Sequence, residues 1–247
     1  MKSTVTYWAT GNGRAIPIAR VHSMSDIAAT LREMGLAPAR PVLVIVGGAG
    51  SLSEPELRLL GPLFSEGLAP LAEALGAAVV DGGTDAGVMR LIGQARAETG
   101  ATFPLIGVAP AGKVLAPGEL ESSGGTHLEP HHTHIVLVPA ASWASGVDWL
   151  AAVAEAQAGE APSVTVLIGG GDVTWIDAEA SVKAGRPLVV VRGTGRVADT
   201  LAAFLDGEAH DERAEEIAAS GLLTMVDLMD GPAAVAAAVE RALDRSR

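Results

Sequence analysis

The sequence predicts an α/β protein with a single doubly wound, mainly parallel sheet, helices on both faces and a short N-terminal β-hairpin. Short apolar runs rich in Val, Ile and Leu alternate with Ala-rich segments of helical spacing along the chain. This alternation is typical of strand–helix–strand units with right-handed crossovers. The 247 residues are 49% hydrophobic but only 3% aromatic, so the core must consist mainly of Ala, Val and Leu, as in buried parallel strands.

The composition argues against several classes of partner. The 17 basic and 29 acidic residues give a net charge of −12, so counterion release would contribute little and we expect no nucleic-acid partner. The chain has no cysteine, which removes disulfides and thiolate metal sites. It has no apolar signal core at its N-terminus and no apolar run long enough to cross a bilayer. We therefore expect a cytoplasmic protein without a membrane partner.

One domain is expected over residues 1–247, because this length suits a single large α/β core. Residues 1–22 are predicted to be an N-terminal β extension. The motifs lie in a core at residues 40–205, and residues 206–247 close the domain with helices and one strand. The sequence contains no linker and no internal repeat beyond the strand–turn–helix unit.

The N-terminal half is predicted in the following order. Residues 3–22 form two short strands around the turn Gly11-Asn12-Gly13, and Pro17 limits the second strand to a sheet edge. Ser23 or Ser25 caps a helix that runs to about Met34. The next elements are a strand at 41–46, a helix at 54–75 broken near Pro62, a strand at 77–80, a helix at 84–99 and a strand at 105–109.

The C-terminal half begins with a loop rich in Gly and Pro at residues 110–125, and loops of this length in compact domains are usually functional. The elements expected after it are a strand at 135–138, a helix at 143–158, a strand at 164–168, a helix containing 178–184, a strand at 188–191, a helix ending near 205, an acidic helix, a strand at 222–226 and a helix at 232–243.

Four predicted strands end in a glycine-rich turn that leads into a helix, at residues 42–50, 79–90, 164–174 and 188–199. A helix N-terminus presents free backbone N–H groups and the positive end of the helix dipole, which suit a phosphate. In a parallel sheet all four turns would lie along the rim formed by the carboxyl ends of the strands, where such sheets bind ligands. The sequence therefore predicts a nucleotide pocket at this rim.

The first two glycine turns differ in how specific they are. Gly47–Ser51 lacks the last glycine of the dinucleotide fingerprint and is followed by no P-loop lysine, so the alternative to a binding loop is a tight turn between strand and helix. In the second turn, Gly82 and Gly83 would let a ligand approach the backbone, and Thr84 can cap the helix and donate to a phosphate. Asp81 would either act in the site or accept hydrogen bonds from the amides of its own loop.

The last glycine turn, Gly193–Ala198, matches G-x-G-x-x-A, but no acidic residue follows at the spacing that would hold a ribose. Arg196 can bind a phosphate through two nitrogens or pair with a carboxylate such as Asp199. Among the few tryptophans, Trp175 lies near the rim, where it would stack on a base or pack in the core.

Four histidines, His127, His131, His132 and His134, lie within eight residues. On a strand, His132 and His134 would share one face and could supply two metal ligands. Glu129 is the only carboxylate in the segment placed to complete such a site. We therefore expect no metal, and we assign these side chains to polar contacts with a ligand or within the core.

Taken together and in this order, the motifs resemble those of the SLOG superfamily, and most closely those of its LSDAT branch. That branch includes the cytoplasmic N-terminal homology region of melastatin-type TRP channels and its prokaryotic relatives. The resemblance covers roughly residues 40–205. Its motifs are Ile45–Ala49, Asp81–Thr84 with Gly87–Arg90, Leu105–Ala109, Leu128–His134, Leu167–Gly171 and Arg192–Asp199.

The resemblance implies a Rossmann-like domain that binds nucleotide-derived ligands such as ADP-ribose or NAD-related molecules. A more distant resemblance, to Lonely-Guy-type phosphoribohydrolases, places their G-G-x-G-T-x-x-E pattern on residues 170–177. Here Val173 replaces a glycine, Asp177 replaces the catalytic glutamate, and Pro117–Leu120 lacks the arginine of that family. Losing an arginine that steadies the leaving ribose phosphate costs several kcal/mol of transition-state stabilisation, unless Lys113 or Arg90 substitutes.

We therefore expect a sensor that binds an ADP-ribose- or NAD-like nucleotide, requires no cofactor and forms homo-oligomers. The alternative is a nucleotide N-glycosidase or phosphoribohydrolase, with Asp172, Asp177 and Arg90 as catalytic candidates. The predicted ligand-binding residues are Gly47, Gly48, Ala49, Gly50, Ser51, Gly82, Gly83, Thr84, Val88, Lys113, His132, Thr133, His134, Gly170, Gly171, Asp172, Thr174, Gly193, Thr194, Gly195 and Arg196.

Overall fold

A computed structural model of the chain describes residues 3–9, 15–37, 39–50, 52–115 and 125–245. Within these ranges nine strands form one sheet, and two short strands form a separate pair. The strands are β1 (Thr4–Ala9), β2 (Ala15–Arg20), β3 (Val42–Gly47), β4 (Ala78–Asp81), β5 (Leu105–Pro110), β6 (Val114–Leu115), β7 (Thr126–His127), β8 (His134–Val138), β9 (Ser163–Ile168), β10 (Leu188–Arg192) and β11 (Leu223–Asp227).

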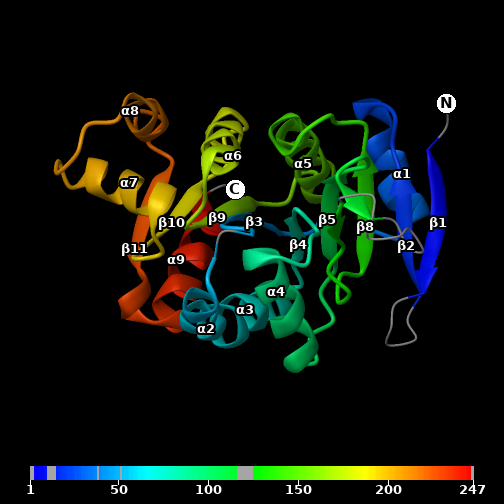
Figure 1. Cartoon of the computed structure of the whole chain (residues 1–247), viewed down its shortest axis with the longest axis horizontal. Coiled ribbons are helices and arrows are strands. Elements are labelled where there is room, and N and C mark those ends of the chain that lie inside the picture. The colour runs from blue at the N-terminus through cyan, green and yellow to red at the C-terminus, as the bar shows by residue number, and fades with distance from the viewer. Residues whose placement is uncertain (1–2, 10–14, 38, 51, 116–124, 246–247) are drawn as a thin grey trace.

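Helices lie on both faces of the large sheet (Figure 1). They are η1 (Met24–Asp26), α1 (Ile27–Glu33), α2 (Glu54–Pro62), η2 (Leu63–Leu68), α3 (Ala69–Ala74), α4 (Gly87–Glu98), α5 (Trp143–Ala158), α6 (Asp172–Lys183), α7 (Arg196–Leu205), α8 (Glu212–Ala218), η4 (Leu228–Asp230) and α9 (Pro232–Arg245). None of these helices is both long and apolar enough to be a membrane span, within the part of the chain that the structure describes.

The sheet separates two apolar cores. Successive side chains of a strand point to opposite faces. In β3, Val42, Val44 and Val46 therefore pack under α1, α5 and α6, whereas Leu43 and Ile45 pack under α2, α3, α4 and α9. Both cores consist mainly of Ala, Val, Leu and Ile, as the composition predicted.

The strand order is β1-β2-β8-β5-β4-β3-β9-β10-β11. β1 and β2 are antiparallel, and all other neighbouring strands in this order are parallel. The predicted fold class, a doubly wound and mainly parallel sheet with an N-terminal hairpin, is confirmed. The predicted turn of that hairpin, Gly11–Gly13, lies outside the described residues.

The edge position predicted for the second strand is wrong, because β2 lies between β1 and β8 and the edge strand is β1. Pro17 is opposite Tyr7 of β1. The parallel pairing of β2 with β8 begins only at Ile18, opposite Ile135. Pro17, which has no N–H to donate, therefore sits just before the ladder with β8 starts.

Two helix boundaries also differ from the predictions. The α-helix expected at 54–75 ends at Pro62, near the predicted break, but the chain stays helical and continues through the π-helical segment η2 into α3, which ends at Ala74. Thr84 does not cap α4, which begins at Gly87 with Ala86 as its N-cap. Thr84 forms an isolated antiparallel bridge with Leu128 instead.

The chain reverses its direction of travel across the sheet at β3. From β3 it proceeds outward through β4, β5 and β8, then returns along α5 to β9 on the other side of β3 and continues to β10 and β11 (Figure 1). The loops that leave the carboxyl ends of β3 and β9 therefore lead to helices on opposite faces. In doubly wound sheets a crevice opens at such a switch point, and ligands bind there.

Candidate functional site

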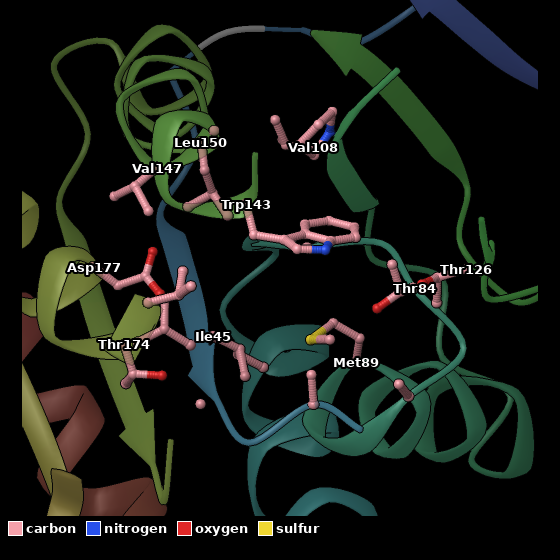
Figure 2. Close-up of a pocket in the computed structure, with 18 of the residues that line it drawn as sticks. Ile45, Thr84, Met89, Val108, Thr126, Trp143, Val147, Leu150, Thr174 and Asp177 are labelled. Carbon is pink, nitrogen blue, oxygen red and sulfur yellow. The ribbon is translucent and has the colours of Figure 1, made fainter. Parts of the chain in front are cut away.

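A cavity of about 320 Å³ lies at this switch point, beyond the carboxyl ends of the central strands (Figure 2). Its walls come from β3 and β5, the loop after β4, the first turn of α4, and the starts of α5 and α6. The lining residues are Ile45, Val46, Gly47, Ala49, Gly50, Gly82, Thr84, Ala86, Met89, Val108, Pro110, Thr126, Trp143, Gly146, Val147, Leu150, Val173, Thr174 and Asp177.

Glycine allows the loop after β3 and the start of α4 to meet at this cavity. Gly87 has a φ of +50°. A Cβ atom on this residue would lie 1.9 Å from the carbonyl oxygen of Gly48, so no other residue fits. The next residue fastens the contact, because the Val88 N–H donates to the same Gly48 oxygen at 2.9 Å. The predicted closeness of the first two glycine turns therefore has a direct structural basis.

The cavity wall is largely apolar, and its polar side chains lie on two opposite sides. In Figure 2, Asp177 and Thr174 lie on one side and Thr84 and Thr126 on the other, with the indole ring of Trp143 between them. Among the described residues that line the cavity, none is a lysine, an arginine or a histidine. A ligand here would meet hydroxyl groups, one carboxyl group, backbone groups and apolar surface, which is the usual composition of a small-molecule site.

Asp177 is the ionisable side chain of this wall. Burial raises the pKa of the Asp177 carboxyl to about 7, far above the ordinary aspartate value, because the apolar surroundings disfavour the charged form. Near neutral pH this carboxyl group therefore exists in both protonation states. A strongly perturbed carboxyl in a cavity is a candidate for proton transfer or for hydrogen bonding as a neutral acid.

A second group of buried ionisable residues lies outside the cavity wall. The His132 ring is fully buried, with Nε2 2.8 Å from Asp81 Oδ1 and Nδ1 2.8 Å from Glu129 Oε2. Burial alone would lower the pKa of His132, but the two carboxylates outweigh it and raise the pKa to about 9. His132 is therefore an imidazolium that donates from both ring nitrogens. We call Asp81, Glu129 and His132 the buried network.

The buried network fastens the loop after β4 to the segment before β8. The Gly83 N–H donates to Asp81 Oδ1 at 2.7 Å, and the Glu129 N–H donates to the Gly83 oxygen at 3.0 Å. The prediction that Asp81 accepts hydrogen bonds from its own loop is confirmed. Since Gly82 and Thr126 of these two segments line the cavity, the buried network holds part of the cavity wall in place.

Of the four histidines in this motif, only His132 is buried in the core, and none of the four lines the cavity. Thr133 and His134 are at the amino end of β8, where Thr133 Oγ1 bonds both the N–H and the oxygen of Leu105 at 2.9 Å and lies 2.7 Å from His134 Nδ1. His131 Nδ1 is 2.6 Å from Glu129 Oε1. The described residues contain no group of three or more His, Cys, Asp or Glu side chains placed to hold a metal ion.

In the turn after β10, two backbone N–H groups donate to a carboxylate of the same segment. Asp199 accepts from the N–H of Gly193 at 2.6 Å and from the N–H of Gly195 at 3.1 Å. Thr194 Oγ1 accepts from the Gly169 N–H at 2.7 Å and donates to the Val191 oxygen at 2.6 Å. The carboxylate of Asp199 thus occupies the position at which a phosphate would meet the amides of this turn. We call residues 193–199 the β10 turn.

The other predicted residues divide into those that line the cavity and those that do not. Arg90 donates to Asp85 Oδ1 at 2.7 Å, and Lys113, Asp172 and Arg196 are exposed. Ser51 and Pro117–Leu120 lie outside the described residues. Of the predicted set, the residues at the cavity are Gly47, Ala49, Gly50, Gly82, Thr84, Thr174 and Asp177. Those that do not line it are Gly48, Gly83, Val88, Arg90, Lys113, His132, Thr133, His134, Gly170, Gly171, Asp172, Gly193, Thr194, Gly195 and Arg196.

Sequence reasoning missed most of the apolar wall. Trp143, Met89 and Thr126 were not predicted as site residues, although each lines the cavity. Of the two roles predicted for Trp175, core packing is the one found: the side chain is buried, with the Arg213 guanidinium 4.3 Å from the centre of its ring. A usable signal existed for Trp143, because it begins the helix that carries the chain back to the switch point.

A doubly wound sheet with a largely apolar cavity at its switch point defines a small-ligand-binding α/β domain. Comparison with known families specifies the kind. The chain belongs to the family described as "SLOG in TRPM, prokaryote", whose model matches residues 40–237. The resemblance inferred from the motifs is thereby confirmed, and the family is one of nucleotide-related ligand-binding domains.

Curated relatives are cation channel subunits. The chain is 28% identical over 207 residues to mouse transient receptor potential cation channel subfamily M member 2, covering 69% of this chain and 14% of that protein. It is 27% identical over 234 residues to the subfamily M member-like 2 protein of Nematostella vectensis, covering 77% and 15%. The rat member 2 protein is 28% identical over 197 residues, covering 65% and 13%. The chain thus spans about a seventh of the length of these relatives.

Proposed function

We propose that the chain binds an ADP-ribose- or NAD-related nucleotide in the switch-point cavity. One observation carries this proposal: three of the four predicted glycine turns contribute to a single cavity. The turn after β3 contributes Gly47, Ala49 and Gly50, the turn after β4 contributes Gly82, and the turn after β9 leads to Thr174. The β10 turn stays outside the cavity and uses its own carboxylate.

The phosphates would lie near the starts of α4 and α6. Both helices have 12 residues, both begin at the cavity, and neither N-cap residue forms a side-chain cap hydrogen bond. By contrast, α5 is capped by Ser142, whose side chain accepts from the Ser145 N–H. Helix dipoles and terminal N–H groups favour an anion, and they would bind the diphosphate without a basic side chain from the described wall.

The uncharged parts of the nucleotide would occupy the apolar remainder of the cavity. Trp143 and Met89 border this space, and Thr174 and Asp177 form one side of it (Figure 2). An indole ring and a methionine sulfur both pack well against a planar base. The hydroxyl of Thr174 and the carboxyl of Asp177 are suited to hydrogen bonds with ribose hydroxyls or the edge of the base.

The second candidate function is cleavage of an N-glycosidic bond in a nucleotide. Asp177 favours it, because a carboxyl group with a pKa of about 7 in a cavity can donate or accept a proton at neutral pH. The described cavity wall supplies no arginine or lysine to stabilise a leaving ribose phosphate, which argues against efficient catalysis by that route. Binding is therefore the primary proposal.

Calorimetric titration of the protein with ADP-ribose, NAD and AMP tests the proposal. Saturable binding of ADP-ribose or NAD supports it, and the absence of binding to all three at millimolar concentration contradicts it. Chromatography of the same mixtures after incubation separates the two candidates. Released adenine or nicotinamide would establish the hydrolase, whereas unchanged ligand would support a binding protein.

Trp143→Ala should weaken ligand binding about 5- to 150-fold, because stacking of a base on an aromatic ring is worth about 1–3 kcal/mol. Titration calorimetry of the variant and the parent protein measures this change. Trp143→Phe is the matched control, since it keeps an aromatic face, and its affinity should stay within about threefold of the parent. Equal affinities for Trp143→Ala and the parent would place the base elsewhere.

A further inference from the structure

We infer that Asp177 contacts the bound nucleotide as a neutral carboxylic acid, so that nucleotide binding takes up a proton. This inference rests on the proposed function and concerns the same cavity. The group of the ligand that contacts Asp177 is then uncharged and accepts a hydrogen bond from the carboxylic O–H. A ring nitrogen of the base or a hydroxyl of the ribose fits this description. A phosphate oxygen that remains anionic is placed elsewhere in the cavity.

The position of Asp177 is the first argument. Its side chain is part of the cavity wall, close to the apolar side chains of Val147 and Leu150 from α5 (Figure 2). Among the described residues that line the cavity, Asp177 is the sole acid or base. No cation of this wall compensates an ionised carboxylate, and burial accordingly raises the pKa of Asp177 to about 7.

The charged residues on the elements packed against α6 are either paired with other groups or exposed. The elements packed against α6 are α5, α7, α8, β3, β9 and β10. β3 and β9 carry no charged residue. Arg192 of β10 pairs with Asp206, Asp199 of α7 accepts from the amides of the β10 turn, and Arg213 of α8 covers Trp175. The remaining charged side chains on α5, α6, α7 and α8 are exposed: Asp148, Glu155, Asp172, Glu179, Lys183, Arg196, Glu212, Glu215 and Glu216.

The charge of the ligand is the second argument. A nucleotide brings negative phosphates into a cavity whose described wall has no basic side chain. An ionised Asp177 would repel them in a medium where charges are poorly screened, whereas a protonated Asp177 would not. The protonated carboxyl also offers one O–H donor as well as an acceptor, while the ionised form only accepts. Binding should therefore raise the pKa of Asp177 further, which is equivalent to proton uptake.

The test is titration calorimetry with ADP-ribose between pH 6 and pH 9. ADP-ribose is preferred to AMP because a phosphate monoester itself titrates near pH 6. If only the protonated form binds, affinity falls with the fraction of protonated Asp177, about 100-fold from pH 6 to pH 9. At pH 8, titrations in two buffers of different ionisation enthalpy should show uptake of about one proton per ligand.

Asp177→Asn sharpens the test, because an amide keeps a donor and an acceptor at every pH. The variant should bind at pH 9 about as tightly as the parent protein at pH 6, with no proton uptake. Glu179→Gln removes an exposed carboxyl from the same helix and should keep the pH dependence of the parent. The pH profile of the parent protein is informative on its own, whatever the folding of the variants.

Three results would overturn the inference while leaving the proposed function intact. They are parent affinity that does not change with pH, parent affinity that rises with pH, and an Asp177→Asn variant that folds but binds weakly at every pH. The last result would mean that an ionised carboxylate contacts the ligand. Absence of binding by the parent protein at every pH would overturn the proposed function itself, and this inference with it.

Discussion

The cavity and the buried network treat a carboxyl group in opposite ways. In the buried network, Glu129 is almost fully buried and lies against His132 and His131. Burial acts to raise the pKa of Glu129, but the hydrogen bonds and charges of these histidines outweigh it and hold the pKa below its ordinary value. In the cavity, Asp177 has no such partner among the described residues, and burial raises its pKa. Pairing keeps one carboxyl ionised, and isolation makes the other a titrating group.

This difference separates framework from site. Groups that are hydrogen-bonded to other parts of the chain, as in the buried network and the β10 turn, fix the positions of the loops. Asp177 and the starts of α4 and α6 border the cavity instead, and neither helix has a side-chain cap there, so these groups are the candidates for contact with a ligand. Perturbed pKa values occur in both settings, so a shifted pKa alone does not identify a site, and the internal partners of the group must be considered with it.

Removing His132 should have the largest effect on stability. His132→Ala leaves Asp81 and Glu129 buried without their shared cation, and breaking a buried ion pair in this way costs about 3–5 kcal/mol. Urea denaturation followed by circular dichroism measures the change. His131→Ala is the control: its side chain is 32% exposed, and its loss should cost less than about 1 kcal/mol. Similar costs for the two variants would show that His132 is not the cation that holds the network.

The buried network also sets the sign of a pH dependence. The pKa of His132 in the folded chain, about 9, lies above its ordinary value of 6.5, so its contribution is complete below pH 6.5 and is lost as the pH rises through 9. The pKa of Glu129 is below its ordinary value of 4.5, so its contribution is present above that pH and is lost in acid. The difference in unfolding free energy between the parent and His132→Ala should be greatest between these limits.

Asp177 should have the opposite effect to Glu129 on the pH dependence of stability, and Asp177→Asn should remove this effect. The folded pKa of Asp177, about 7, lies above its unfolded value of 3.8, so the parent protein loses stability as the pH rises from about 4 to 7. One pKa unit corresponds to about 1.4 kcal/mol. Because the side chain is partly open to the cavity, we expect a gain for the variant of about 2–3 kcal/mol at pH 8 and almost none at pH 4.

Denaturation curves for Asp177→Asn and the parent protein at pH 4, 6 and 8 measure this gain. Glu179→Gln, an exposed change on the same helix, should show no comparable trend. A gain that does not depend on pH would mean that Asp177 is ionised throughout this range. The contrast between the cavity carboxyl and the paired carboxyls would then disappear.

Gly93→Ala sharpens the comparison from the packing side. Alanine normally stabilises a helix interior by about 1 kcal/mol relative to glycine. At Gly93 of α4, however, a Cβ atom would lie 2.2 Å from the buried carboxylate of Glu129. We expect a net loss of about 1–3 kcal/mol, because overpacking would displace that carboxylate from His132. Thermal denaturation measures it, and Gln94→Ala, exposed on the same helix, should change stability by less than about 0.5 kcal/mol. A stabilised Gly93→Ala would show that Glu129 can move freely.

The fold was largely predictable from the sequence because strand and helix periodicities are local. The strand at 41–46 and the helix at 143–158 were placed within one residue of β3 and α5. The prediction for the strand containing Pro17 failed for a reason outside that strand: its neighbour β8 comes more than 100 residues later and pairs only from Ile18 onward. Likewise, Thr84 does not cap α4, because it pairs with Leu128 in an isolated bridge. The two residues are far apart in the sequence, so local sequence patterns do not predict this contact.

The site was predictable only where the backbone makes it. Glycine turns mark the ends of β3 and β4, and both turns reach the cavity. The turn Gly193–Gly195 looks the same in the sequence, but Asp199 accepts from its amides, and that fact depends on the conformation of the turn. Apolar wall residues such as Trp143 are of the same residue types as those in the core. The sequence alone therefore does not separate wall residues from core residues; their place beside the switch point of the sheet does.

Arg196 provides the most delicate test of this distinction. The sequence suggests a phosphate-binding guanidinium, whereas the structure shows an exposed side chain on the β10 turn, with the backbone at a φ of +52°. Arg196→Gly should stabilise the fold by about 0.5–1 kcal/mol, because glycine adopts this left-handed conformation without strain. Thermal denaturation measures the gain, and Arg196→Ala, which removes the charge but keeps a Cβ atom, should show none.

Ligand binding by the same two variants decides whether Arg196 contacts the ligand or belongs to the structural framework. In the β10 turn, the amides of Gly193 and Gly195 donate to Asp199, and Arg196 does not line the cavity. Calorimetric titration with ADP-ribose should therefore give affinities within about twofold of the parent for Arg196→Gly and Arg196→Ala. A tenfold loss in both would mean that the guanidinium reaches the ligand. The β10 turn would then be part of the binding site. Hydrogen bonds between its amides and Asp199 would no longer be a reason to assign the turn a purely structural role.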